Sequence, residues 1–186
     1  MNAKAIFDTV RPWLDSKGFT PDRIAALDAA IAGEVKPAPS GRVLSQAGVD
    51  LIKQFEGLEL KAYPDPGSGG EPWTIGIGHT GGVRPGDVIT EARAEQLLRQ
   101  DVGRFEKAVN KLAPRTTQSQ FDAMVSLAFN VGEGNLAKSS VIRKHNAGDF
   151  AGAAQSFALW NKAAGRVMAG LTRRRAAEAS LYRSGS

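Results

Sequence analysis

Residues 55–80 read FEGLELKAYPDPGSGGEPWTIGIGHT, and this stretch decides the fold. It begins in the last turn of an amphipathic helix that we predict to open at Ser45 and to end at Gly57. Residues 60–89 then become rich in Gly and Pro and contain short β-branched runs. This change of composition predicts a small β-lobe directly after the helix.

Beyond the β-lobe the apolar residues recur at helical spacing. Thr90 is placed to cap a long helix, and Thr117 with Gln120 forms the capping box of the next. Asp149 caps a further helix, and residues 172–182 make the last. We therefore expect an α+β fold that is mainly α, a helical domain with a small β-hairpin lobe.

The N-terminal part has a different character. Residues 1–33 carry two short apolar stripes separated by Gly18, which predicts an N-terminal helical hairpin. Residues 34–42 (EVKPAPSGR) have the Pro, Ser and Gly content of a linker. We expect the main domain to occupy residues 43–186.

Composition excludes several kinds of chemistry. The 186 residues contain no Cys and only two His, His79 and His145, so thiolate metal sites and cysteine nucleophiles are excluded and a zinc enzyme would lack ligands. We expect neither a metal nor a cofactor. No run of about 18 apolar residues and no standard secretory signal is visible, so we expect a cytosolic product without stable membrane insertion.

The positive charge is concentrated at one end of the chain. The net charge is +5, and residues 143–186 carry 8 basic and 2 acidic side chains. This excess indicates either an anionic partner, such as nucleic acid, a membrane surface or bacterial wall polymer, or a solvated basic face. Arg173, Arg174 and Arg175 could meet anionic wall polymer or pair with Glu178. They stand beside alanines rather than aromatic residues, so we do not expect nucleic acid as the partner.

One glycine motif is misleading. Gly76, Gly78 and Gly81 spell G-x-G-x-x-G after a predicted strand, the fingerprint of dinucleotide binding. That fingerprint must open a helix whose N-terminus holds the pyrophosphate. Residues 82–86 (GVRPG) cannot begin a helix, so a nucleotide site is not expected.

Two carboxyl groups in unlike settings are the stronger signal. Glu56 ends a helix beside apolar residues, and both the helix dipole and this setting should raise its pKa, as a general acid requires. Asp65 lies between two prolines in a turn, where it should stay ionised. Thr74 follows on a strand, with a hydroxyl able to orient a water molecule. Such a pair is typical of glycoside hydrolysis, but from the pattern alone Glu56 could be an ordinary helix-end carboxylate and Asp65 a turn former.

The sequence of these residues resembles a known family. E-G-L-x-L-K-A-Y-x-D followed by W-T-I-G-I-G-H-T is similar to the phage-type lysozymes, glycoside hydrolase family 24. The resemblance continues, in family order, through ITEARAEQLLRQDV (89–102), QSQFDAMVSLAFNVGEG (118–134) and GLTRRRAAEASLY (170–182). It spans residues 43–183 and implies a lysozyme-like domain.

The resemblance also implies an activity. The family hydrolyses the β-1,4 bond between N-acetylmuramic acid and N-acetylglucosamine in bacterial peptidoglycan, with inversion. Glu56 would be the catalytic acid, and Asp65 with Thr74 would hold the attacking water on the opposite face of the sugar. Inversion requires roughly 6.5–9.5 Å between the two carboxyl groups. Eight residues separate Asp65 from Thr74, more than the family pattern usually has, and they include Glu71 as an alternative second carboxylate.

Other family positions can be carried over residue by residue. The resemblance pairs His79 with Asp101, which lies on the apolar stripe of its helix and needs a partner there; we interpret this as a structural pair rather than a catalytic one. It also places Gly78, Phe129 and Ser140 at the substrate, although the spacing of Phe129 alone favours a core position.

The leading hypothesis is therefore an endolysin muramidase that lyses the bacterial host. It would be held in the host cytoplasm and would reach the wall in the periplasm after a membrane-permeabilising partner, a holin, has acted. A lytic transglycosylase would use one Glu without Asp65 or Thr74 and leave an anhydro sugar. A basic helical module that binds nucleic acid or wall without cutting is the alternative from another class.

Overall fold

The computed structural model describes residues 41–64 and 69–185. The chain divides into two units, residues 1–40 and 41–186. The two helices predicted within residues 1–33 lie outside the described residues, as does most of the predicted linker. The boundary at residues 34–42 therefore stays a prediction.

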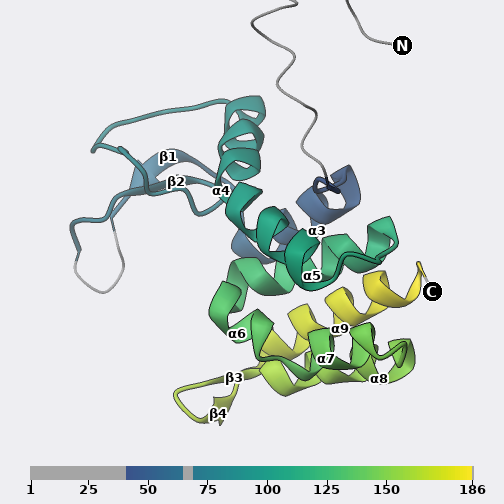
Figure 1. The fold of residues 1–186 in the computed structure, drawn as a ribbon. Coiled ribbons are helices and arrows are strands. Elements are labelled where there is room, and N and C mark those ends of the chain that lie inside the picture. The colour runs from purple at the N-terminus through teal and green to yellow at the C-terminus, as the bar shows by residue number, and fades with distance from the viewer. Residues whose placement is uncertain (1–40, 65–68, 186) are drawn as a thin grey trace, which may run out of the picture. The chain divides into compact units, whose positions relative to one another are not determined.

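The second unit is mainly helical, as predicted, with a small antiparallel hairpin (Figure 1). Its helices are α3 (Gln46–Glu56), α4 (Glu91–Leu112), α5 (Gln118–Val131), α6 (Glu133–Ala137), α7 (Ser140–Asn146), α8 (Phe150–Ser156) and α9 (Ala169–Arg183), with a 3-10 turn η1 (Phe157–Trp160). Its strands are β1 (Glu59–Tyr63), β2 (Thr74–Gly76), β3 (Lys162–Ala163) and β4 (Arg166–Val167). The predicted caps hold: Thr90 accepts from Arg93 N, and Thr117 with Gln120 forms a complete capping box.

The β-lobe connects α3 to α4. Strands β1 and β2 pair antiparallel, with Tyr63 opposite Thr74 and an irregular register between the two ends. The segment before α4 joins the other edge of β1, because Ile89 N donates to Leu60 O at 2.9 Å. Gly76 has φ +68°, and a Cβ there would lie 3.2 Å from Ala94 Cβ, so glycine allows the lobe to pack closely on α4.

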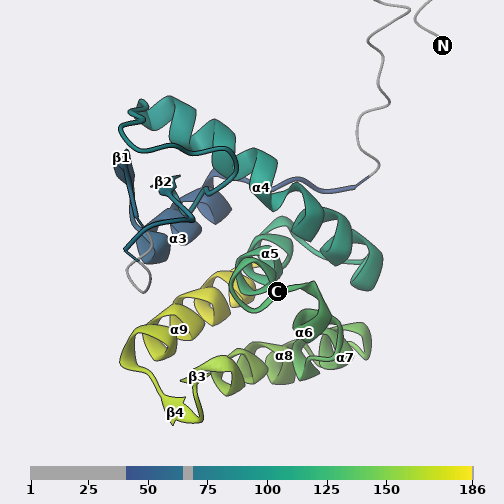
Figure 2. The ribbon, with the colours of Figure 1, turned by 90° about the vertical axis from the view of Figure 1, so that its left-hand side faces the viewer.

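Helix α5 forms the centre of the core. Every residue from Gln120 to Ala128 is buried, and the helix packs against α9, α4, α3 and α6. Figure 2 shows α4 running from the β hairpin toward the helices α5–α9. A helix buried on all sides anchors its neighbours, so α5 holds α3 and α9 in place together.

Three features differ from the sequence prediction. Helix α9 begins at Ala169 rather than Thr172, and Thr172 lies in its first turn, where Oγ1 donates to Met168 O at 3.0 Å. Helices α6 and α7 were not predicted; they are too short to show an apolar period, although Ser139 caps α7. The small β3–β4 hairpin was also not predicted.

Candidate active site

Glu56 is the last residue of α3, as predicted. The helix ends there because Gly57 takes φ +83°, and its N–H donates to Lys53 O at 3.0 Å. The Glu56 side chain is 26% exposed. The helix therefore delivers a carboxyl group to the surface at a fixed point of the backbone.

The opposite end of α3 is fixed to the core. Ser45 N donates to Asp122 Oδ1 at 3.0 Å, and Ser45 Oγ donates to Asp122 Oδ2 at 2.5 Å. Asp122 belongs to α5 and is buried. Leu44 N also donates to Glu106 Oε1 of α4 at 2.7 Å. These bonds set the direction of α3, and hence the position of Glu56 relative to α5.

A buried arginine from the far end of the chain contacts Glu56. Arg174 Nη1 lies 2.5 Å from Glu56 Oε1, although 118 residues separate them. The Arg174 side chain is 4% exposed, and its guanidinium also donates to Glu178 Oε1 at 3.2 Å and to Ser126 O at 3.4 Å. The carboxyl group at the surface is thus tied to a charge in the interior.

Glu178 and Arg175 extend this cluster inward. Arg175 Nη2 donates to Glu178 Oε1 at 3.2 Å and to Asn130 Oδ1 at 2.9 Å. Arg175 Nε lies 3.1 Å from Glu178 Oε2 as an ion pair without hydrogen-bond geometry. Burial raises the pKa of Glu178, opposed by the charges of Arg175 and Arg174 and by the hydrogen bond from Ser126. Burial also lowers the pKa of Arg175, while the charge of Glu178 acts to raise it.

The three consecutive arginines of α9 therefore differ in burial and in partners. Arg174 and Arg175 pair with Glu178, one of the two alternatives that the sequence left open, and both are too deeply buried to meet a wall polymer. Arg173 is exposed. The i,i+4 spacing of Arg174 and Glu178 pointed to that pair, but nothing local to either segment indicated the contact between Arg174 and Glu56.

The second carboxylate cannot be located in the same way. Asp65 lies outside the described residues, so its separation from Glu56 stays a prediction. Thr74 is the first residue of β2, is half-buried and pairs with Tyr63 of β1. Asp65 and Glu71 belong to the segment of sequence that connects these two residues. Glu71 is exposed.

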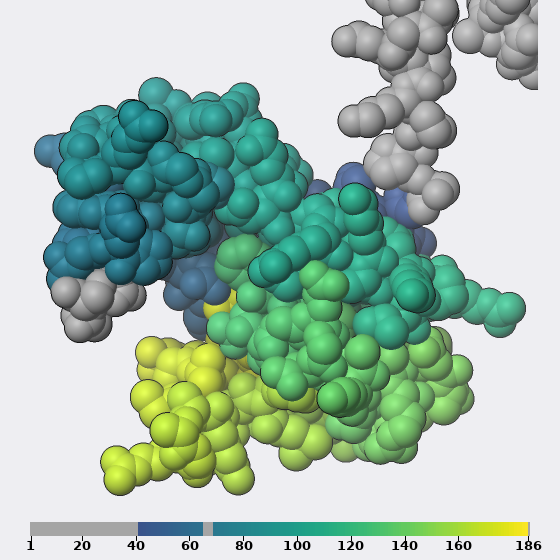
Figure 3. Space-filling view, turned by 60° about the vertical axis from the view of Figure 1, so that its left-hand side comes forward, coloured from purple at the N-terminus to yellow at the C-terminus, as the bar shows by residue number. Residues whose placement is uncertain are grey.

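Glu56 lines a pocket of about 670 Å³ between the end of α3, the start of α9 and the β3–β4 hairpin. Phe55, Met168 and Arg173 contribute to its wall, so apolar and basic surface surround the carboxyl group. In the space-filling view the molecule is hollowed between the β-lobe with α4 and the yellow C-terminal segment (Figure 3). The described part of the chain thus presents a cleft with an acid on its wall.

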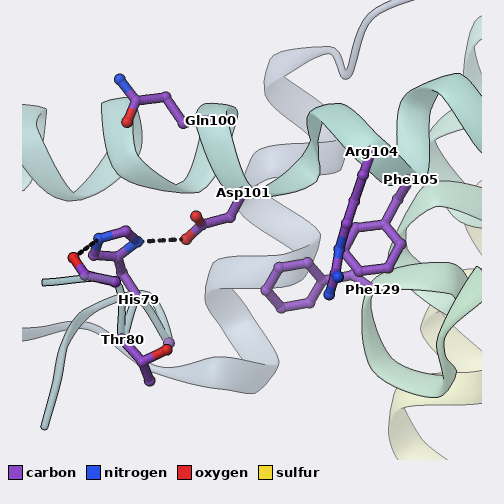
Figure 4. A pocket seen from close by; sticks show the side chains of 9 residues that line it. His79, Thr80, Gln100, Asp101, Arg104, Phe105 and Phe129 are labelled. Atoms are coloured by element: carbon purple, nitrogen blue, oxygen red, sulfur yellow. Dashed lines mark hydrogen bonds and ion pairs between the residues drawn. The ribbon is translucent and has the colours of Figure 1, made fainter. Parts of the chain in front are cut away.

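A second pocket of about 510 Å³ lies where the β-lobe meets α4 and α5 (Figure 4). His79 Nδ1 lies 2.8 Å from Asp101 Oδ2, and His79 Nε2 lies 2.9 Å from Gly81 O. Asp101 is partly exposed, at 32% of its side chain, so it lies at the edge of the apolar stripe rather than inside the core. The pair links the β-lobe to α4.

The predicted substrate contacts fall in different places. Gly78 and Phe129 both line this second pocket. Phe129 is half-buried and packs edge-to-face on Phe105, with ring centroids 5.6 Å apart and an interplanar angle of 67°. It therefore combines the core position that its spacing favours with a face toward the pocket. Ser140 is half-buried at the start of α7.

This mainly helical domain with a small β hairpin has the lysozyme class of fold, as its likeness to a solved phage lysozyme shows. Comparison with known proteins makes this specific. The sequence model described as Phage lysozyme matches residues 53–178. The chain belongs to the phage lysozyme family.

Relatives and solved structures agree with this assignment. An endolysin of Bacillus phage B103 is 49% identical over 144 residues, covering 76% of this chain and 54% of the relative, so the chain spans about half the length of that relative. The muramidase domain of SpmX from Asticaccaulis excentricus has a TM-score of 0.68 and 43% identity, covering 76% of this chain and 98% of that one. A P22 lysozyme mutant has a TM-score of 0.70 and 36% identity, covering 76% and 99%.

Proposed function

We propose that this protein is an endolysin muramidase, an inverting glycoside hydrolase that cleaves the β-1,4 bond between N-acetylmuramic acid and N-acetylglucosamine in peptidoglycan. The observation that carries the proposal is Glu56, a helix-end carboxyl group on the wall of a cleft, in a chain of the phage lysozyme family. Its proposed biological role is lysis of the bacterial host at the end of phage growth.

In the proposed mechanism Glu56 protonates the glycosidic oxygen as the bond breaks. Proton donation leaves a carboxylate, and Arg174, already in contact with Glu56 Oε1, stabilises that product of the transfer. Asp65, with the hydroxyl of Thr74, holds and deprotonates a water molecule that attacks the anomeric carbon from the opposite face. The water requires room between the carboxyl groups, and the product has the inverted configuration.

The test is loss of turbidity of permeabilised Gram-negative cells. Glu56→Gln keeps the size and hydrogen-bonding capacity of the side chain but removes the acidic proton, so we expect lysis to fall by at least about 100-fold. The matched control is Glu59→Gln, the same change at an exposed carboxylate on β1, which should keep lysis near the wild-type rate. Comparable lysis by Glu56→Gln and wild type would refute the role of Glu56.

The site of action is the cell wall, and we propose that the enzyme reaches it from the host cytoplasm through a holin-dependent lesion. Among the described residues no helix is both long enough and apolar enough to cross a membrane. The proposed route predicts that expression in Escherichia coli leaves growth intact until chloroform or a co-expressed holin permeabilises the membrane. Rapid lysis on expression alone would contradict this route and leave the muramidase proposal untouched.

A further inference from the structure

Four charged groups of alternating sign run from the cleft into the core. Glu56 is followed inward by Arg174, Glu178 and Arg175, whose side chains are only 4%, 0% and 1% exposed. Arg174 contacts both Glu56 and Glu178, and Glu178 contacts both Arg174 and Arg175. With all four groups ionised, the formal charges of the row sum to zero.

Glu178 and Arg175 form the inner pair of this row, and the stability of the helix does not require a buried ion pair there. Burying ions costs several kcal/mol for each, and apolar side chains of similar size often serve stability as well. The inner end nevertheless has further partners: Ser126 Oγ donates to Glu178 Oε1 at 2.8 Å, and Asn130 accepts from Arg175, although Arg175 Nε and Nη1 and Glu178 Oε2 make no hydrogen bond within the described part of the chain. Glu178 thus lies one guanidinium away from Glu56, in a buried part of the molecule where interactions between charges are weakly screened.

Few other described charges face Glu56. Arg173 of α9 lines the same pocket. Lys53, one turn earlier on α3, lies 3.4 Å from Glu91 and 3.9 Å from Glu95 of α4, so its charge is directed away from the cleft. From α5, the neutral Asn130 lines the pocket. Arg174 and the two charges behind it are therefore the interior groups that act on Glu56.

We propose that Glu178 and Arg175 are positioning residues that set, through Arg174, the pH range over which Glu56 holds the proton it donates. This inference rests on the proposed function, in which Glu56 is the acid. Glu178 occupies one side of the Arg174 guanidinium and so limits how strongly Arg174 favours the ionised form of Glu56. Arg175 offsets part of the charge of Glu178 and therefore strengthens the preference for the ionised form of Glu56.

A purely structural role makes a different prediction. Loss of packing or of hydrogen bonds lowers stability and activity without regard to the sign of the charge removed. Charge balance predicts shifts of opposite sign from the two inner residues and cancellation when both are removed. The alkaline limb of the pH profile of kcat/KM reports these shifts, because it marks loss of the protonated acid.

The experiment measures that limb for four variants on purified peptidoglycan, with folding checked by near-ultraviolet circular dichroism. Glu178→Gln should move the limb to lower pH by on the order of one pH unit. Arg175→Gln should move it to higher pH, and the double variant should return it close to the wild-type position. Ser126→Ala removes a hydrogen bond to Glu178 without changing charge, so its limb should stay in place.

A second readout does not depend on activity. The ¹³C-carboxyl resonance of Glu56, assigned by its absence in Glu56→Gln, can be titrated in each variant and should show the same opposite shifts. If the wild type proved inactive, the proposed function would be refuted, but this titration would still test whether Glu178 and Arg175 act on Glu56. Shifts in the same direction, no shifts, or failure of both single variants to fold would overturn the proposal and assign Glu178 and Arg175 to stability alone.

Discussion

Glu56 occupies a position that its neighbours in the sequence determine only in part. The apolar period and Gly57 predicted that α3 would end at this residue, and it does. The contact with Arg174 could not be predicted, because it depends on how α9 packs across α5 from the other end of the chain. Local rules of helix ending therefore place the acid, whereas its electrostatic partner is a property of the tertiary structure.

The choice of second carboxylate is also decided at the level of single residues. Asp65 has the family spacing from Glu56, whereas Glu71 lies later in the same lengthened segment. We expect Asp65→Asn to reduce the rate of turbidity loss by at least about 100-fold, because the water then lacks its base. Glu71→Gln, the matched neutralisation, should keep most of the activity. The reverse pattern would transfer the role to Glu71.

At the scale of elements, capping residues were the most dependable sequence signals. The caps at Thr90, Thr117 and Asp149 all accept the expected backbone N–H, because capping depends on a few adjacent residues. Elements without such local signals, α6 and the β3–β4 hairpin, were missed. The hairpin forms one wall of the pocket that holds Glu56, so part of the site followed from structure alone.

The cap of α8 offers a direct stability test. Asp149 Oδ1 accepts from Gly152 N at 2.8 Å, and the helix is only seven residues long. Asp149→Ala should lower the free energy of unfolding by about 1 kcal/mol, measured by urea denaturation. Asp149→Asn retains a capping oxygen and should lose clearly less. Equal losses in the two variants would show that the carboxylate acts through its charge rather than as a cap.

At the scale of the whole molecule, α4 runs from the β-lobe to the helices α5–α9 (Figure 2), and the surface is hollowed between the β-lobe with α4 and the C-terminal segment (Figure 3). The apolar pattern predicted a mainly helical domain with a β-lobe, and the structure confirms both. No single segment of the sequence predicts the pockets. The pocket of Glu56 is lined by residues of α3, α5, α9 and the β3–β4 hairpin, and the second pocket by residues of the β-lobe, α4 and α5, which only the folded chain brings together.

The contact between His79 and Asp101 tests how the β-lobe is held to α4. We propose a structural role, so Asp101→Ala should lower the free energy of unfolding by about 1–2 kcal/mol in thermal melts, because a partly buried charged hydrogen bond is lost. Asp101→Asn keeps an acceptor and should lose less. Lysis measured well below the melting temperature should stay within about threefold of wild type. A loss of 100-fold in folded protein would assign the pair to catalysis instead.

The most direct test of the central claim is mass spectrometry of purified peptidoglycan after digestion with wild type and with Glu56→Gln. Hydrolysis adds water across the β-1,4 bond, so wild type should release fragments with reducing N-acetylmuramic acid ends, and Glu56→Gln should release almost none. Fragments ending in anhydro-muramic acid would identify a lytic transglycosylase. Intact glycan chains that nevertheless retain the protein would identify a binding module, and either result would contradict the muramidase account.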